Sequence, residues 1–426
     1  MSELELEALI VKVSADIERQ TEVLQGLQRN KSHLHRRLNA LRDPMARLPL
    51  EIAAEIFLQC LPSDKDPRPS DTHMLLLNVC HAWTDIAIST PRLWAELYLD
   101  LPQPEGFPEL LQKWLQWART QPLNISLDGY VDVRVVSTIW LHSHNLTSLH
   151  VDFSDVTVDD YYEDGHYNAL GGAIPQEPLL CLEELSFVGR TSIDMSWRSI
   201  FELLRLAPNL VDLDFRSMPR IRPLDVPKEP VLLPNLRKFS SSGGALAMHL
   251  QCITAPRLEN LTFRSVKNPC DDKILSFLRR SSPPLRVLEL ADCSRIPDSD
   301  LAQLPEFLSL LPTMDHLKLG NWGIGDAAQL IRILPERVPN LRILELFYDD
   351  SNHPASDPKW NMLATSLRVC RGSRVQSIRL TVALGLIGVK DNTRALFREL
   401  GAGGMDVRVV DDDGQDLLSA PTTRNY

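Results

Sequence analysis

The chain has 426 residues, 44% of them hydrophobic, and a formal net charge of −11 at pH 7, with its basic residues scattered. This balance argues against nucleic acid as a partner, and the longest apolar run, residues 380–389, is too short to span a membrane. Seven cysteines without a CxxC pair and an acidic, non-signal-like start predict a reducing, cytoplasmic or nuclear location.

The first predicted element is a coiled-coil helix over residues 3–43, ended by Asp43-Pro44. Nine of the eleven heptad seam positions are apolar, and Gln20 and Lys31 are the exceptions. The a positions are Ile10, Ile17, Leu24, Lys31 and Leu38, and the d positions are Leu6, Val13, Gln20, Leu27, Leu34 and Leu41. Such a helix would expose an apolar stripe to water. Either it forms a coiled-coil homodimer, or it folds back on its own domain.

Residues 46–96 predict two short apolar helices separated by a polar loop, residues 62–73. The first begins at Leu48-Pro49, where proline needs no hydrogen-bond partner for its nitrogen. The second is predicted to stop at Pro91 and carries its apolar residues at helical spacing: Leu76, Val79, Cys80, Trp83, Ile86 and Ala87. Two helices of this size cannot bury so much apolar surface between themselves. They are either ordinary core helices or part of a docking module.

Several sequence elements in residues 46–96 match a known protein family in their order and spacing. These elements are Leu48-Pro49, Glu51-Ile52, Ile56-Phe57, Val79-Cys80, Trp83 and the closing Ser89-Thr90-Pro91-Arg92-Leu93-Trp94. The segment resembles an F-box, in the F-box-like form common in fungal proteins. That resemblance implies docking on the Skp-family adaptor of cullin–RING ubiquitin ligases, while the rest of the chain recruits a substrate. It also implies adaptor contacts, or direct supports of them, at Leu48, Pro49, Ile52, Ile56, Phe57, Val79, Trp83 and Leu93.

From residue 97 to residue 412 a repeat of variable length predicts parallel strands, each followed by a helix. An apolar anchor stands three residues before an apolar-x-apolar triplet in ten places, and most successive triplets lie 24 to 29 residues apart. The anchors are Trp94, Leu146, Leu182, Leu210, Leu236, Leu258, Leu285, Met314, Leu341 and Val375. Residues 125–127 and 407–409 predict two further strands, and only the triplet at Phe239 breaks the pattern, with Ser241.

This spacing is typical of leucine-rich repeats. The array resembles the irregular repeats attached to many F-box proteins, and a doubly wound sheet of unrelated βα units is the alternative. The predicted fold is therefore α/β: an N-terminal coiled-coil helix (residues 3–43), a short all-α F-box-like module (46–96), a leucine-rich-repeat solenoid (97–412) and a polar tail (413–426).

Two long inserts follow the ends of predicted strands and combine tyrosines with carboxylates. They supply the candidate substrate-binding residues Tyr161, Tyr162, Glu163 and Asp164, and Tyr348, Asp349 and Asp350. Aromatic rings provide rigid contact area and carboxylates select a basic partner, so we expect the two loops to favour positively charged segments. The alternative is two solvated loops without a partner.

Motifs of known catalytic chemistry are missing from the sequence: HExxH, GxSxG, a Walker loop and paired metal-binding cysteines. We therefore predict a protein that is not an enzyme and uses neither cofactor nor metal. By resemblance, it is an F-box-like subunit that links an unknown target protein to a Skp–cullin–RING ligase. The alternative function is a scaffold that dimerises through its coiled coil and has no ligase partner.

Overall fold

The computed structural model describes residues 3–61, 70–156, 168–190, 195–222, 224–243, 246–265, 268–292, 303–349, 356–383, 389–402 and 405–418. The chain divides into two compact units. The first contains residues 1–99 and 109–123, and the second contains residues 100–108 and 124–426.

The predicted N-terminal helix is present as α1 (Glu3–Arg42). It ends where Pro44 cannot continue the helical hydrogen bonding, and the backbone N–H of Met45 donates to the Asp43 carboxylate at 2.9 Å. A short 3-10 turn, η1 (Met45–Arg47), follows. Apolar side chains on α1 are exposed, with Ile17 at 60%, Leu27 at 61% and Leu34 at 63%.

The next segment contains three helices, α2 (Leu50–Gln59), α3 (Ser70–Val79) and α4 (His81–Ile88), where the sequence predicted two. The predicted second helix is broken at Cys80, whose backbone is extended with φ −163° and ψ 166°. Two side-chain bonds hold this break. The Thr84 hydroxyl donates to the Leu77 carbonyl at 2.8 Å, and the Cys80 thiol donates to the Asp43 carboxylate at 3.3 Å. The predicted polar loop is also shorter, because α3 already begins at Ser70.

Aromatic side chains form the core of the first unit. The fully buried Trp94, in the 3-10 turn η2 (Pro91–Trp94), donates its indole N–H to the Ala87 carbonyl at 2.8 Å. Its ring centroid lies 4.7 Å from that of Trp117 and 5.9 Å from that of Trp114, both on α5 (Phe107–Ala118). His73 is buried beside them, with Nε2 2.7 Å from the Leu93 carbonyl oxygen.

All twelve predicted strands are present, and they form one parallel sheet in chain order. They are β1 (Glu96–Leu101), β2 (Leu123–Gly129), β3 (Leu146–Asp152), β4 (Glu184–Val188), β5 (Asp212–Arg216), β7 (Lys238–Ser242), β9 (Asn260–Arg264), β10 (Val287–Ala291), β11 (His316–Gly320), β12 (Ile343–Tyr348), β13 (Ser377–Val382) and β14 (Asp406–Val410). Two short strands that the sequence did not predict, β6 (Val231–Leu232) and β8 (Ile253–Thr254), pair separately.

The strands align by their triplets. From β3 to β14, the first residue of each triplet pairs with the first residue of the next, so Leu149, Leu185, Leu213, Phe239, Leu261, Leu288, Leu317, Leu344, Ile378 and Val407 lie in one row. Because side chains alternate between the faces of a strand, the first and third triplet residues share one face and the middle residue lies on the other. Every member of this row except Val407 is buried.

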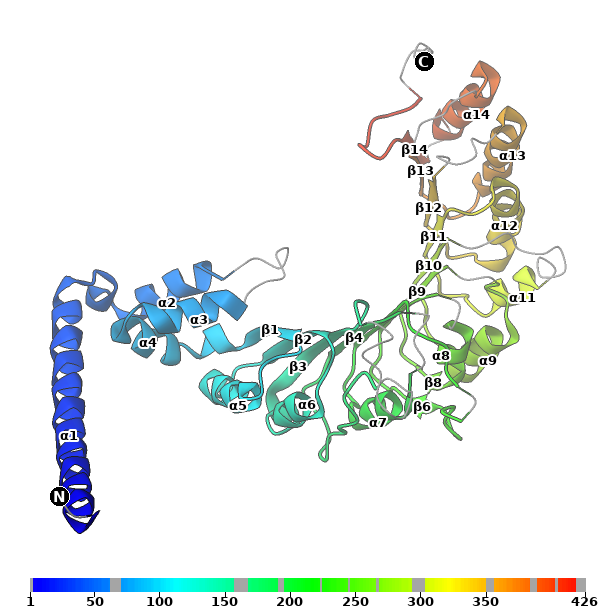
Figure 1. Ribbon diagram of the computed structural model, residues 1–426. Coiled ribbons are helices and arrows are strands. Elements are labelled where there is room, and N and C mark those ends of the chain that lie inside the picture. Colours follow the sequence, from blue (N-terminus) through cyan, green and yellow to red (C-terminus); the bar gives the residue numbers. More distant parts are fainter. Residues whose placement is uncertain are drawn as a thin grey trace. The chain divides into compact units, whose positions relative to one another are not determined.

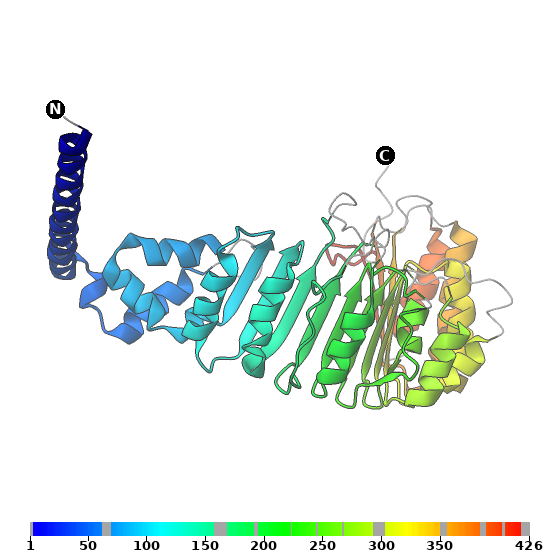
Figure 2. The same cartoon turned by 60° about the horizontal axis from the view of Figure 1, so that its bottom comes forward.

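Helices cover the buried face of the sheet in the second unit (Figures 1 and 2). The described helices there are α6 (Val133–Trp140), α7 (Arg198–Leu206), α8 (Leu246–Gln251), α9 (Asp272–Ser281), α11 (Leu304–Ser309), α12 (Ile324–Arg337), α13 (Asp357–Leu367) and α14 (Asp391–Ala402), with 3-10 turns η3 (Ser143–Asn145) and η5 (Arg368–Cys370). The strand order contains no reversal, so the sheet differs from a doubly wound one.

Asparagines of three Pro-Asn-Leu segments, each just before a strand, connect neighbouring repeats. The side-chain amides of Asn209, Asn235 and Asn340 donate to the carbonyls of Leu180, Pro208 and Pro312 at 2.8, 3.1 and 2.9 Å. Each acceptor lies just before the strand of the preceding unit. Asn209 and Asn340 follow the ends of α7 and α12, whereas Asn235 follows β6, and all three asparagines join one strand-containing unit to the next.

The start of the predicted polar tail folds back on the sheet. The Leu417 N–H donates to the Val409 carbonyl at 2.8 Å, and the Arg398 guanidinium donates to the Leu418 carbonyl at 2.7 Å. The remainder of the tail lies outside the described residues. Among the helices that the structure describes, none has the length and apolar character needed to cross a bilayer.

Candidate functional site

An exposed apolar stripe runs along α2. Ile52 and Ile56 lie one helical turn apart on α2, and Leu48 lies in the extended segment just before the helix. Their side chains are 52%, 40% and 39% exposed. Pro49, also exposed, starts the helix because its carbonyl accepts the N–H of Ile52 at 3.0 Å. These exposed apolar residues therefore lie at the start of α2 and along its first two turns.

A second exposed apolar pair lies on α3. Leu75 and Val79 are one turn apart and are 64% and 50% exposed. The sequence predicted Val79 as a site residue and missed Leu75, as it missed Leu50, which is 47% exposed on α2. The unbroken run from Met74 to Leu77 was the available signal, because such a run is wider than one helix face can bury.

The other predicted adaptor residues lie beneath these stripes. Phe57 and Leu93 are fully buried, and Trp83 is half-buried with its ring centroid 5.0 Å from that of Phe57. Ala53 is buried on the same side of α2 as Phe57. The eight predicted residues therefore separate into five on the surface (Leu48, Pro49, Ile52, Ile56 and Val79) and three that support it.

The face of the sheet opposite the described helices of the second unit is a separate candidate site that the sequence analysis did not assign to residues. The middle residues of the triplets lie on this face and are mostly polar: Ser186, Asp214, Ser240, Thr262, Glu289, Lys318, Glu345 and Arg379. A pocket of about 210 Å³ opens between β5, β7 and β9, and its lining includes Asp214, Arg216, Ser240, Ser242, Thr262 and Arg264. The signal was present in the triplets, whose middle position is polar at each of these strands.

Charges on this face are paired across and along strands. Burial raises the pKa of Asp214, and Arg216, with its Nε 2.7 Å from the carboxylate, opposes that rise. Burial also lowers the pKa of His316, whose Nε2 lies 3.4 Å from the Glu345 carboxylate. The Lys318 amine is 3.5 Å from the same carboxylate. A partner with a polar surface could bind this face by forming its own ion pairs with these side chains in place of the present ones.

The predicted substrate-binding loops are only partly described. Tyr348 is half-buried at the end of β12, with its ring centroid 5.3 Å from that of Trp360. The exposed Asp349 donates its backbone N–H to the Asn321 side chain at 2.9 Å. Tyr161, Tyr162, Glu163, Asp164 and Asp350 lie outside the described residues. The contact of Tyr348 with Trp360 favours a packing role for its ring.

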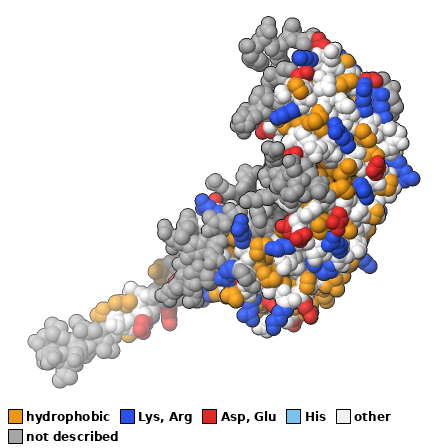
Figure 3. Space-filling model, turned by 90° about the vertical axis from the view of Figure 1, so that its right-hand side faces the viewer, with side chains coloured by type: hydrophobic (Ala, Val, Ile, Leu, Met, Phe, Trp, Pro, Cys, Tyr) orange, Lys and Arg blue, Asp and Glu red, His pale blue; other side chains and the backbone are white. Residues whose placement is uncertain are grey.

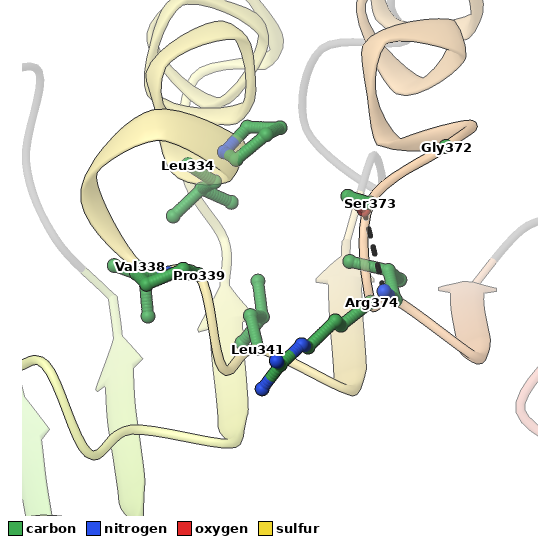
Figure 4. Close-up of a pocket in the computed structure, with 9 residues that line it drawn as sticks. Leu334, Val338, Pro339, Leu341, Gly372, Ser373 and Arg374 are labelled. Carbon is green, nitrogen blue, oxygen red and sulfur yellow. Dashed lines mark hydrogen bonds between the residues drawn. The ribbon is translucent and has the colours of Figure 1, made fainter.

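A further cleft of about 260 Å³ lies between the end of α12 and the loop after η5 (Figure 4). Its lining combines apolar and polar surface, with Leu334, Val338 and Leu341 on one side. Arg374 is its one ionisable lining residue, and its guanidinium donates to the Asn340 side chain at 2.8 Å. Because a guanidinium stays protonated, Arg374 cannot act as a proton acceptor in this cleft.

On the side of the molecule shown in Figure 3, acidic and basic side chains are intermixed with apolar ones. Ion pairs also join neighbouring helical elements of the second unit: Arg279 on α9 with Glu306 on α11, and Arg368 in η5 with Glu399 on α14. Exposed pairs of this kind contribute little to stability. No family model matches this sequence, and a search among curated proteins finds no match either.

Proposed function

We propose that the protein is an F-box-like substrate-recognition subunit that links a target protein to a Skp–cullin–RING ubiquitin ligase. In this proposal α2, α3 and α4 form the F-box-like module, and the strand–helix array is a leucine-rich-repeat solenoid that binds the target. The module uses the exposed stripes on α2 and α3 to contact the Skp-family adaptor. The protein itself catalyses no step.

The observation that carries the proposal is the contrast between Ile56 and Phe57. Adjacent in sequence, they are 40% exposed and fully buried, respectively. Phe57 packs against Trp83 and so fixes α2, while Ile56 shares the exposed side with Ile52 and Leu48. An exposed row of large apolar side chains over a packed support is typical of a protein-docking surface.

The register of the strands supports the solenoid. Each unit contributes one strand, one turn and in most cases one helix, and neighbouring units share the same row of buried residues. Stacked units of this kind leave one continuous face of the sheet available for binding. The polar open face around Asp214 and Glu345 is therefore the surface we assign to the target protein, whose identity the chemistry of this face does not specify.

The test is binding of the full-length protein to a purified Skp-family adaptor. Ile56→Asp and Leu48→Asp should each weaken binding by about 2 kcal/mol or more, because a charge would be placed in a desolvated contact. Leu224→Asp is the matched control, since Leu224 is 95% exposed in the second unit. If the wild type does not bind, or if both stripe variants bind as well as the control, the ligase proposal is wrong.

A thermal unfolding measurement separates docking from folding. Ile56→Asp and Leu48→Asp should lower the unfolding temperature less than a core substitution does, because about two fifths of each side chain is already exposed. Phe57→Ala should instead lower the free energy of unfolding of its unit by about 3–5 kcal/mol, since it leaves a cavity against Trp83. A stripe variant that unfolds like Phe57→Ala would show that the stripe belongs to the core.

A second candidate function is a scaffold that dimerises through α1 and binds partners without a ligase. The exposed apolar side chains along α1 favour it, because a helix stripe of this kind is stabilised by a second helix. The two functions differ in one measurement. A scaffold would dimerise while failing to bind the Skp-family adaptor at any concentration.

A further inference from the structure

The apolar row of α1 is exposed along the described part of the helix. Between 41% and 63% of each seam side chain is accessible at Val13, Ile17, Leu24, Leu27, Leu34 and Leu38. The described part of the chain therefore leaves this row uncovered, which argues against α1 folding back on its own domain. Two polar residues, Gln20 and Lys31, interrupt the row.

The charges of α1 are divided between its two halves. Residues 3–22 contain six acidic and two basic residues, whereas residues 23–42 contain five basic residues and no acidic one. Two such helices side by side in the same direction would place like charges together along their whole length. Two helices in opposite directions would place each acidic half against a basic half, which is favourable at the short distances of a helix pair.

The polar seam residues also favour an antiparallel arrangement of the two helices. In a parallel pair each seam residue faces its own copy, so that Lys31 would face a second Lys31 in an otherwise apolar layer. An antiparallel pair matches a positions with d positions. One alignment places Lys31 opposite Gln20 of the second copy, and it then pairs Ile17 with Leu34, Leu24 with Leu27 and Val13 with Leu38. In this alignment Lys31 and Gln20 occupy the same two layers of the seam, and every other layer contains only apolar residues.

The residues that flank the seam agree with this alignment. Asp16 and Arg37 both occupy g positions, which face each other in an antiparallel pair, and the alignment places Asp16 of one copy beside Arg37 of the other. Asp16 contacts Arg19 of its own helix at 3.3 Å, with its side chain 49% exposed, so it remains accessible to a second cation. In a parallel pair Arg37 would instead face Arg42 and repel it.

We propose that α1 forms an antiparallel homodimer in which Lys31 of each copy lies opposite Gln20 of the other. The occupant of the exposed stripe is thus a second copy of this chain. The inference rests on the self-association invoked for the scaffold function, and it is independent of adaptor binding. Charge complementarity selects the direction, and the two polar layers select the alignment.

Thiol crosslinking of the full-length protein tests the direction. Two differently tagged chains, Ile17→Cys and Leu34→Cys, are prepared with the exposed Cys60 and Cys181 replaced by serine. Mixed and mildly oxidised, they should form a covalent heterodimer. Neither chain should crosslink alone, because two Ile17 positions would lie about 25 Å apart along the antiparallel pair. An Arg29→Cys chain mixed with Leu34→Cys is the control, since Arg29 occupies the outward f position.

Two results would overturn the proposal in different ways. Crosslinking of Ile17→Cys with itself would show a parallel pair, which keeps self-association and rejects the direction. A monomer by light scattering at every concentration, with no crosslink in the mixture, would reject self-association as well. Adaptor binding is measured separately on the same chains, so neither result depends on the ligase proposal.

Charge reversal gives an independent readout. Arg37→Glu should weaken dimerisation roughly three- to tenfold, because two symmetry-related attractions become repulsions. Adding Asp16→Arg to it should restore the wild-type dissociation constant. A parallel dimer predicts the opposite, because Arg37→Glu would then attract Arg42. Tighter association of the single variant would therefore reject the antiparallel arrangement.

Discussion

The Nδ1 atom of His249 lies 3.2 Å from the Oγ atom of Ser241, and both side chains are buried. Ser241 is the one residue that breaks the apolar triplet pattern, on β7, and His249 is on the helix that follows, α8. The ring of His249 also contacts that of Trp197 in a tilted arrangement, with ring centroids 4.6 Å apart. A polar pair therefore occupies a place where every other triplet of β3 to β13 has an apolar residue.

The first prediction concerns pH. Burial lowers the pKa of His249 from 6.5 to about 3, so the folded protein keeps the ring neutral while the unfolded chain binds a proton below pH 6.5. Stability therefore falls as the pH drops, and His249 should contribute a loss of about 1.5–2 kcal/mol between pH 6.5 and pH 5. Denaturation of wild type and His249→Phe at both values measures it. An identical pH dependence in the two proteins would contradict the prediction.

The second prediction is a double-mutant cycle on the same pair. Ser241→Val restores the triplet pattern but removes the partner of a buried ring nitrogen, so we expect a loss of about 1–3 kcal/mol. Ser241→Val combined with His249→Leu should recover most of that loss, because both polar groups are then replaced by apolar ones. The free energies come from urea denaturation. Simple additivity of the two changes would show that the pair is not coupled.

The third prediction concerns the asparagine links between repeats. Asn340 donates to the Pro312 carbonyl at 2.9 Å and accepts from Arg374 at 2.8 Å. Asn340→Ala should lower the free energy of unfolding by about 1 kcal/mol. Asn340→Asp keeps the acceptor of the Arg374 bond, so it should lower that free energy by less than the alanine variant does. Hydrogen exchange in β11 and β12 should locate the weakening. Unchanged exchange there would argue against a role in joining the repeats.

The fourth prediction concerns cysteine reactivity. Cys60 and Cys181 are exposed, whereas burial raises the pKa of the Cys252 and Cys370 thiols to about 11. Because the thiolate is the reactive form, iodoacetamide at pH 8 should modify Cys60 and Cys181 first and leave the two buried thiols intact until the protein unfolds. Peptide mass spectrometry before and after denaturation measures the order. Early labelling of Cys252 would show that its part of the fold opens readily.

The strands could be predicted because two independent patterns coincide at each of them. An anchor three residues ahead and alternation within the triplet together set the position and the face of a strand, and the observed register of Leu288 with Leu317 and Leu344 agrees with both. The break at Cys80 could not be predicted, because the helical spacing from Leu76 to Ala87 continues across it. Only the tertiary bonds of Thr84 and Cys80 reveal it.

The candidate site was predictable in part. The resemblance pointed to α2, which has exposed apolar residues, but a sequence pattern does not separate Ile56 from Phe57, since both are large apolar residues next to each other. Their exposure depends on which side of α2 meets Trp83. The open face of the sheet was likewise overlooked. Its residues are the middle residues of the triplets, and only the structure shows that the described helices pack on the opposite face. A buried pair such as Ser241 and His249 appears in the sequence only as an exception.

The length of α1 has a consequence for how two copies would work together. In the antiparallel pair the two Arg42 residues stand at opposite ends of the shared segment, about 50 Å apart at 1.5 Å per residue. A parallel pair would hold them side by side. The helix pair would thus separate the domains that follow α1 in the two copies, and both copies could bind large partners at once without a collision. A tether of this length would also let both copies engage two points on one extended or multimeric target, with the gain in avidity that simultaneous attachment brings.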